Sequence, residues 1–433
     1  MRIRILIPVI IVLYIGGSLL FSENKPAHSI IIKNAHIIPV IGEELPEGDI
    51  LIQDRLIKAI GKNLEVPPGA EIIDGKGFFA YPGMIDSHCP LGICEISNLA
   101  ATTDFQEIGQ LNPQVKVLEA LKPDSIHIPV ARANGITAAH VVPQGQFIAG
   151  QTGLIRLNGW IPKEMIIKSP VAMHVLIRDY PKSMRGSSVS EEKKIKAIEE
   201  LKDLFAQVRL YKKAKETAAK NLRISAPDFD EALEFMIPVV EGQIPVMFSA
   251  NSEKEIQAVI DFIREEKIKV ILYGAREAEK MVDKIKELEI PVILGSLLNM
   301  PSSWEEGYDS AYRTPAVLQK AGIIFAFSSE RYLPPLSVDL PYQASKAIAF
   351  GLDQKEALKA VTINPARIFG VGDRMGSLEP GKEANIVLTD GDILDRRTNI
   401  CHILIDGKPV DLSNEYTDLL KKFEERIKPK KIQ

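Results

Sequence analysis

The chain has 433 residues, of which 45% are hydrophobic and 25% are charged, and its formal net charge at pH 7 is -4. This is the composition of an ordinary globular protein. It lacks the basic excess of a nucleic-acid-binding surface, so no nucleic-acid partner is expected. Cys89, Cys94 and Cys401 are too few for a disulfide framework. Cys89 and Cys94 could form one bridge or share one soft metal ion, although lone cysteines are usually small buried apolar residues.

Residues 1–27 have the pattern of an export signal or an N-terminal anchor. Arg2 and Arg4 precede an apolar run over residues 5–21, and polar residues follow it. A basic start before an apolar run is typical of a secretory signal. An uncleaved anchor is the alternative, because the run approaches the ~17 residues that can span a bilayer. Both interpretations predict that the rest of the chain lies outside the cytoplasm and meets a membrane only through this segment; a buried strand or helix is the third alternative.

Two patterns divide the rest of the chain. Residues 29–83 are rich in predicted strands, at 30–38 and in a hairpin of 48–52 with 56–61, and the stretch 71–80 leads into the next motif. From residue 84 to about 370, apolar β-branched runs alternate with helical stretches; these runs lie at 137–142, 244–248, 270–273, 291–294 and 322–327. Continuous apolar strands between helices predict a parallel sheet covered on both faces. So many units favour a closed (β/α)8 barrel, which carries its chemistry at the carboxyl ends of its strands.

The remaining segments complete this outline. Residues 188–221 are rich in Lys and Glu and are expected to form a solvated helix that covers the barrel. Residues 340–370 are helical, and strands return at 384–388 and 400–407. The C-terminus is expected to form a charged helix over residues 419–433.

The stretch 80–92 organises the chain. A tight turn at Pro82-Gly83 leads into a short buried strand that carries Asp86 and His88. Because side chains alternate along a strand, Asp86, His88 and Pro90 share one face, and Ser87 and Cys89 point to the other. Polar residues on one face of an apolar strand predict the mouth of a barrel or a cleft.

Three ordered motifs carry a resemblance to a known family. They are YPGMIDSH at 81–88, AVTINPARIFG at 360–370 and GSLEPGKEANIV at 376–387. With them, the chain resembles the amidohydrolase superfamily from residue 30 to residue 412, in particular its imidazolonepropionase-like members of the periplasmic type. The resemblance implies an α/β fold in which residues 84–371 form a TIM-type (β/α)8 barrel. Residues 29–83 and 372–412 would form one composite β-sandwich, and residues 413–433 a charged tail.

The resemblance also implies a chemistry. Such proteins hydrolyse carbon–nitrogen bonds in cyclic amides, amidines or dipeptide-like substrates, using a divalent metal such as zinc to activate water. The usual ligands are two His from a His-x-His on the first barrel strand, one His each from the fifth and sixth strands, and an Asp at the end of the eighth. Family members are often dimers or larger, so a homo-oligomer is expected by analogy.

This sequence departs from that ligand pattern. His88 keeps the first position, but Pro90, Ser249, Tyr273 and Ser329 stand where the other ligands are expected. Glu330 is the nearest carboxylate to the last position. A catalytic zinc usually takes three protein ligands, so the substitutions predict a metal centre that is lost or much reduced.

The candidate site residues follow from this comparison. His88 and Glu330 are the catalytic candidates, and His88 is also the candidate metal ligand; the alternative for His88 is a hydrogen bond to Asp86 or Ser249. The candidates for contacting a small-molecule ligand are Asp86, Gln151, Ser249, Tyr273 and Ser329. Other polar residues have weaker claims: Glu95 and Arg313 as ligand contacts, His140 on the third strand as a displaced metal ligand or a core residue, and His174 as a surface or rim residue.

Three functions stay open at this point. The first is an exported hydrolase with an unusual one-ion site formed by His88 and a carboxylate such as Glu330. The second is a non-catalytic envelope protein that binds a small molecule or a partner in the barrel pocket. The third, a metal-free hydrolase, has no nucleophile–base pair in the sequence to support it.

Overall fold

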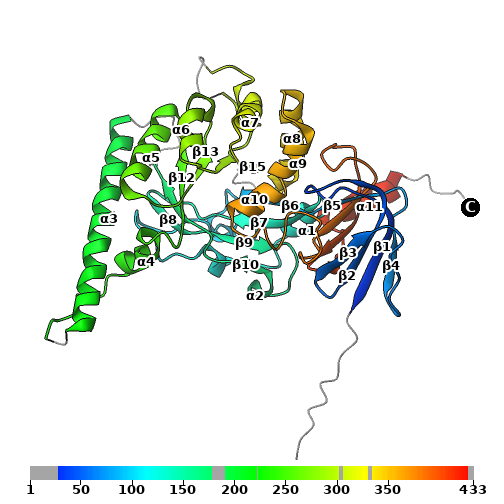
Figure 1. Cartoon of the computed structure of the whole chain (residues 1–433), viewed down its shortest axis with the longest axis horizontal. Coiled ribbons are helices and arrows are strands. Elements are labelled where there is room, and N and C mark those ends of the chain that lie inside the picture. The colour runs from blue at the N-terminus through cyan, green and yellow to red at the C-terminus, as the bar shows by residue number, and fades with distance from the viewer. Residues whose placement is uncertain (1–27, 178–190, 222, 302–305, 330–333, 428–433) are drawn as a thin grey trace, which may run out of the picture.

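The computed structural model describes residues 28–177, 191–221, 223–301, 306–329 and 334–427, which form a mixed α/β protein. Figure 1 shows a curved sheet at one end, a central region of strands and helices, and the long helix α3 (Glu191–Lys220) at the other end. The segment predicted as an export signal lies outside the described residues. Within the described ranges, no helix combines the length and apolar character needed to cross a bilayer.

The curved sheet combines strands from both ends of the chain. Its order is β18-β17-β16-β5-β1-β2-β3, and β4 also pairs with β1. Alternate residues of these strands fill one core, in which Ile30 and Ile32 pack with Ile52, Ile386 and Leu404. The strands are β1 (Ser29–Ile37), β2 (Leu45–Gln53), β3 (Leu56–Gly61), β4 (Glu71–Asp74), β5 (Phe79–Pro82), β16 (Ile386–Thr389), β17 (Ile400–Ile405) and β18 (Lys408–Pro409).

The stretch at 71–80 that leads into β6 contains two separate strands, β4 and β5. Gly77 has a φ of +83°, which ordinary L residues rarely adopt. Gly75 lies so close to β1 that a Cβ there would be 2.8 Å from the Cβ of Ala35. This turn lets β4 and β5 pair in succession with the same edge of β1.

Two further sheets form the central region. The first has the order β10-β9-β7-β6, and the second β15-β14-β13-β12-β11-β8. The members of the first are β6 (Met84–Cys89), β7 (Ile136–Val141), β9 (Gly153–Arg156) and β10 (Ile166–Lys168). Those of the second are β8 (Ile148–Gln151), β11 (Met173–Leu176), β12 (Val246–Ala250), β13 (Val270–Gly274), β14 (Val292–Leu294) and β15 (Phe325–Phe327). Strands β11 to β15 are parallel and adjacent in chain order, and β15 contacts β6.

Helices connect these parallel strands, as the alternating pattern predicts. They include α4 (Glu231–Val240), α5 (Glu253–Glu266), α6 (Val282–Glu287) and α7 (Ser310–Ala321) between strands, and α8 (Leu340–Ala349), α9 (Gln354–Ala360) and α10 (Ile363–Ile368) after β15. The predicted strand at 322–327 begins only at Phe325, because Gly322 ends α7 in the left-handed conformation, with a φ of +75°. Two short helices, α1 (His127–Arg132) and α2 (Pro162–Met165), precede them in the chain.

The long helix α3 confirms the helix predicted from the Lys- and Glu-rich stretch. Its inner face is buried rather than solvated, however, because Leu201, Phe205 and Val208 belong to the main core. The ring of Phe205 meets Phe262 of α5 edge to face at 5.2 Å, and Phe262 in turn meets Phe248 of β12 at 5.7 Å. Aromatic packing thus fixes α3 and α5 against the strand that carries Ser249.

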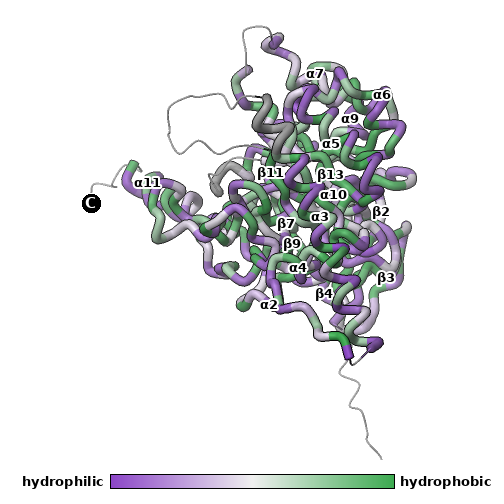
Figure 2. Tube along the Cα trace, turned by 90° about the vertical axis from the view of Figure 1, so that its left-hand side faces the viewer, coloured by the Kyte–Doolittle hydropathy of each residue, from purple (hydrophilic) through white to green (hydrophobic). Residues whose placement is uncertain are grey.

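The last helix, α11 (Glu415–Ile427), begins four residues before the helix predicted at 419–433. Asn414 explains this start, because its side-chain oxygen accepts hydrogen bonds from the backbone N–H groups of Tyr416 and Thr417. The helix extends away from the rest of the chain, at the left of Figure 2.

Candidate functional site

A buried polar cluster combines side chains from four strands of the two central sheets. His88 comes from β6, His174 from β11, Ser249 from β12 and Tyr273 from β13. The imidazole of His88 stacks face to face on the ring of Tyr273, with centroids 4.0 Å apart and an angle of 7° between the planes. The ring of His174 is edge-on to both, 6.1 Å from His88 and 6.2 Å from Tyr273.

His88 is the unusual member of this cluster. Its side chain is almost completely buried, with the residue 2% exposed, yet neither ring nitrogen has a hydrogen-bond partner among the described residues. Burial lowers the pKa of His88 well below its ordinary value, and the nearby His174 and His140 add to this effect. The folded protein therefore holds His88 as a neutral imidazole, which has one N–H donor and one nitrogen acceptor.

His174 has both of its ring nitrogens engaged. Nδ1 lies 2.8 Å from the carbonyl oxygen of Pro143, and Nε2 lies 2.8 Å from Oγ of Ser249. A carbonyl oxygen can only accept, so Nδ1 of His174 carries the proton and donates it. In that tautomer, Nε2 accepts from the Ser249 hydroxyl.

His140 on β7 is held in the same way. Its Nδ1 donates to the carbonyl oxygen of Ser87 at 2.8 Å, and its Nε2 accepts from the hydroxyl of Thr152 at 2.7 Å. Burial lowers the pKa of His140 to about 3. This arrangement is that of a hydrogen-bonded core histidine.

Asp86 fixes the chain that follows β15. One carboxylate oxygen accepts from the backbone N–H of Ser329 at 3.0 Å and from that of His88 at 3.3 Å. The other oxygen accepts from the Ser337 hydroxyl at 2.9 Å. Complete burial raises the pKa of Asp86, while these hydrogen bonds act in the opposite direction. Asp86 therefore positions the segment after β15 beside β6.

The structure brings together most of the residues expected at the site. His88, Ser249 and Tyr273 are linked to one another through His174, and Asp86 binds Ser329 directly behind them. Glu330 lies outside the described residues. Gln151 does not join the cluster, because its side-chain amide donates to the carbonyl oxygen of Pro113 at 3.0 Å. Gln151 thus satisfies a nearby loop, which is the alternative that its loop-like sequence context left open.

Three details of the expected site are wrong. The ring of His88 bonds neither Asp86 nor Ser249; Ser249 pairs with His174 instead. His174 is 1% exposed rather than on the surface, because it lies on β11 between two paired strands. His140 is on the strand next to β6, not on a third strand.

The weaker candidates have local roles. Glu95 is half-buried, and its carbonyl oxygen lies 2.8 Å from Nε2 of His127. Arg313 is largely exposed and pairs with Asp309 one turn earlier, with Nε and Oδ2 3.1 Å apart. Cys89 and Cys94 are buried free thiols, and burial raises the pKa of each.

These residues do not fit the expected metal centre. Among the described residues, no three His, Cys, Asp or Glu side chains are placed to share an ion. Ring nitrogens of His174 and His140 already make hydrogen bonds, as do both oxygens of Asp86. Of His88, His140 and His174, only His88 has ring nitrogens without hydrogen-bond partners among the described residues, and one imidazole is too few for a catalytic zinc site.

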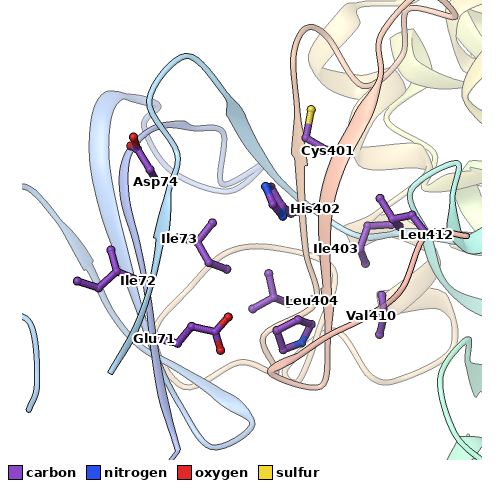
Figure 3. Close-up of a pocket in the computed structure, with 11 residues that line it drawn as sticks. Glu71, Ile72, Ile73, Asp74, Cys401, His402, Ile403, Leu404, Val410 and Leu412 are labelled. Atoms are coloured by element: carbon purple, nitrogen blue, oxygen red, sulfur yellow. The ribbon is translucent and has the colours of Figure 1, made fainter. Parts of the chain in front are cut away.

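The curved sheet holds a cleft of its own. It has a volume of about 440 Å³ and lies between β4 and the β17–β18 hairpin. Figure 3 shows Ile73, Leu404 and His402 among the side chains that line it. It contains none of the site residues predicted from the sequence.

Comparisons with known proteins place the chain in a family. The model of the Amidohydrolase family matches residues 79–424. The solved structure of an amidohydrolase from Thermotoga maritima MSB8 is similar, with a TM-score of 0.81 and 30% identity, covering 88% of this chain and 99% of that one. The amidohydrolase tasK of Hapsidospora irregularis is 23% identical over 83% of this chain, but this chain spans only 39% of its length.

Two other curated relatives carry more specific names. The adenine deaminase of Thermosipho africanus is 22% identical over 85% of this chain, which spans 56% of that protein. The dihydroorotase of Aquifex aeolicus is 23% identical over 86% of this chain and 92% of that protein. The family match covers both the cluster around His88 and the segments that return to the curved sheet. The chain therefore belongs to the amidohydrolase family.

Proposed function

We propose that this amidohydrolase-family protein binds a small neutral ligand, of the cyclic amide or amidine class, at His88. In this proposal the central strands form the (β/α)8 barrel usual for the superfamily, and metal-dependent hydrolysis is lost or much reduced. The relatives named adenine deaminase and dihydroorotase, which act on carbon–nitrogen bonds in cyclic substrates, support the ligand class. The export signal predicted at residues 1–27 would place the protein outside the cytoplasm.

The observation that carries the proposal is the imidazole of His88, whose ring nitrogens have no hydrogen-bond partner in the described part of the chain. A buried polar group without a partner costs about 1–3 kcal/mol, and a ligand that pairs with it recovers this energy. Tyr273 covers one face of the ring, so the hydrogen-bonding edge is what a ligand would contact. The polar groups of a ring amide, a carbonyl and an N–H, complement the donor and acceptor of a neutral imidazole.

The site also favours an uncharged ligand. His88 and His140 are held neutral when folded, and the carboxylate of Asp86 is already occupied by three donors. A charged ligand would lose its hydration without gaining a counter-charge, which is costly in a buried site.

The second candidate function is a protein that retains some hydrolase activity. Glu330 follows Ser329 in the sequence, and the backbone of Ser329 is fixed to Asp86 beside β6. The hypothesis taken from the sequence is a residual hydrolase in which His88 and Glu330 act on the bound ring together. It predicts release of a ring-opened product that disappears in Glu330→Gln.

Binding of hydantoin, measured by calorimetry, tests the first function. We expect wild type to bind this neutral ring amide, and to reject N-carbamoylglycine, the anion formed when the ring is opened. His88→Ala should weaken binding at least about tenfold, since the pairing groups are lost. His402→Ala, which alters an exposed ring in the curved sheet, is the matched control. Equal binding by wild type and His88→Ala, or binding of the anion alone, would contradict the proposal.

A further inference from the structure

We infer that two copies of this chain associate through α11, packed antiparallel about a twofold axis. Thr417 is half-buried, and every other residue of this helix is exposed. Four large apolar side chains nevertheless lie along it: Tyr416, Leu420, Phe423 and Ile427 are 54%, 59%, 53% and 80% exposed. A helix projecting from the molecule, as in Figure 2, can meet a second copy without a clash between the two bodies.

The spacing of these residues is that of a helix–helix contact. They are separated by 4, 3 and 4 residues, which places them on one stripe of the helix, in the alternation found at the core positions of coiled coils. The spacing of 4, 3 and 4 residues is the same from either end of the helix. A twofold antiparallel pair therefore sets Tyr416 against Ile427 of the partner subunit, and Leu420 against Phe423 of the partner subunit. Such a self-complementary patch is what an isologous dimer requires.

The helix α11 needs another surface packed against its apolar face to be stable. An isolated helix of fewer than about 12–15 residues is marginal in water, and α11 has 13 residues with none of them buried. Its apolar surface continues onto the body of the protein, because Leu419 lines an open cleft with Ile126, which is 51% exposed. We call Tyr416, Leu419, Leu420, Phe423, Ile427 and Ile126 the α11 patch.

The charges of the helix bear on whether it meets a protein or a lipid surface. Between residues 415 and 427, Glu415, Asp418, Glu424 and Glu425 are acidic, whereas Lys421, Lys422 and Arg426 are basic. Four negative and three positive charges give a net charge of -1 within the helix, whereas membrane-bound helices are rich in Lys and Arg on their polar face. Lys428, Lys430 and Lys431 follow the helix in the sequence, so the charge of this region does not by itself choose between a protein and an anionic lipid surface. The self-complementary spacing of the apolar stripe selects a second copy of the same patch as the occupant.

Sedimentation velocity of the full chain, at about 1–100 µM, tests the dimer. The contact is small, so a weak dimer in this range is expected. Wild type should reach twice the monomer mass of 47.9 kDa, and Leu420→Glu/Phe423→Glu should stay monomeric. Lys421→Ala/Glu425→Ala changes the opposite face of α11 and should dimerise like wild type. Association through residues 1–27 would survive Leu420→Glu/Phe423→Glu, and that result would overturn the inference, as would a monomeric wild type.

Disulfide trapping tests the antiparallel register. In a Cys401→Ser background, Tyr416→Cys/Ile427→Cys should form a covalent dimer on mild oxidation. Tyr416→Cys alone should not, because the two copies of residue 416 lie about 16 Å apart along an antiparallel pair. Efficient trapping through Tyr416→Cys alone would indicate parallel helices and contradict the proposed packing. Binding of the monomer to vesicles of anionic lipid, lost in Leu420→Glu/Phe423→Glu, would show a membrane-facing helix and overturn the inference.

Discussion

Lowering the pH from 7.5 to 5.5 is expected to reduce the free energy of unfolding by about 3 kcal/mol through His88 and His140. Burial holds the pKa of His88 well below its ordinary value and lowers that of His140 to about 3. Below pH ~6.5 the unfolded chain gains two protons that the folded chain does not bind. Each group then removes up to about 1.4 kcal/mol of stability per pH unit. This contribution to stability is fully present at pH 7.5. It is lost as the pH falls toward the pKa values that the two histidines have in the folded protein.

Urea denaturation at the two pH values measures this loss. His140→Gln removes one titrating group, so the loss between pH 7.5 and 5.5 should fall to about half that of wild type. Burial raises the pKa of Asp86, and this carboxyl acts with the opposite sign. The histidine contribution is therefore read from the difference between wild type and His140→Gln. His402→Gln, at an exposed position, should behave like wild type. Equal pH dependence in wild type and His140→Gln would contradict this account.

Asp86→Ala is expected to destabilise the protein by about 3 kcal/mol, because it leaves buried donors without an acceptor. The backbone N–H of Ser329 and the hydroxyl of Ser337 would both lose their partner. The segment after β15 would also lose its attachment beside β6, so ligand binding at His88 should weaken. Asp86→Asn keeps one acceptor oxygen, and a smaller loss is expected.

Chemical denaturation of these variants at pH 7.5 checks the role of Asp86. Asp395→Ala is the matched control, because Asp395 pairs on the surface with Arg397, whose side chain is 90% exposed. Exposed ion pairs contribute about 0–1 kcal/mol, so this control should stay close to wild type. If Asp86→Ala unfolds at the same urea concentration as Asp395→Ala, Asp86 does not hold the site as described.

Much of the site could be predicted because strand ends meet in parallel sheets. The apolar runs at 244–248 and 270–273 are long enough to identify as strands, and they carry Ser249 and Tyr273 to the position of His88. The residues that flank His174 predict a strand less clearly. Its strand has four residues and pairs with β8 in the antiparallel direction, and only β9, the four-residue helix α2 and β10 lie between the two in the chain. The usual alternation of strand and helix is missing there.

Other features depend on contacts that no local pattern encodes. Gln151 is satisfied by the carbonyl oxygen of Pro113, 38 residues earlier in the chain. The unpaired nitrogens of His88 depend on how its ring stacks against Tyr273, 185 positions later, and not on the sequence around it. The apolar stripe of α11 is visible as a pattern, but only the structure shows that nothing in the described chain buries it.

Metal content tests the central claim most directly. The protein should be purified with zinc present, dialysed against metal-free buffer, and analysed for zinc, manganese and iron by elemental mass spectrometry. The substitution of ligand positions by Pro90, Ser249, Tyr273 and Ser329 predicts well under one ion per chain, with no difference between wild type and His88→Ala. One or more tightly held ions per chain in wild type, released in His88→Ala, would contradict the account and favour a metal-dependent hydrolase.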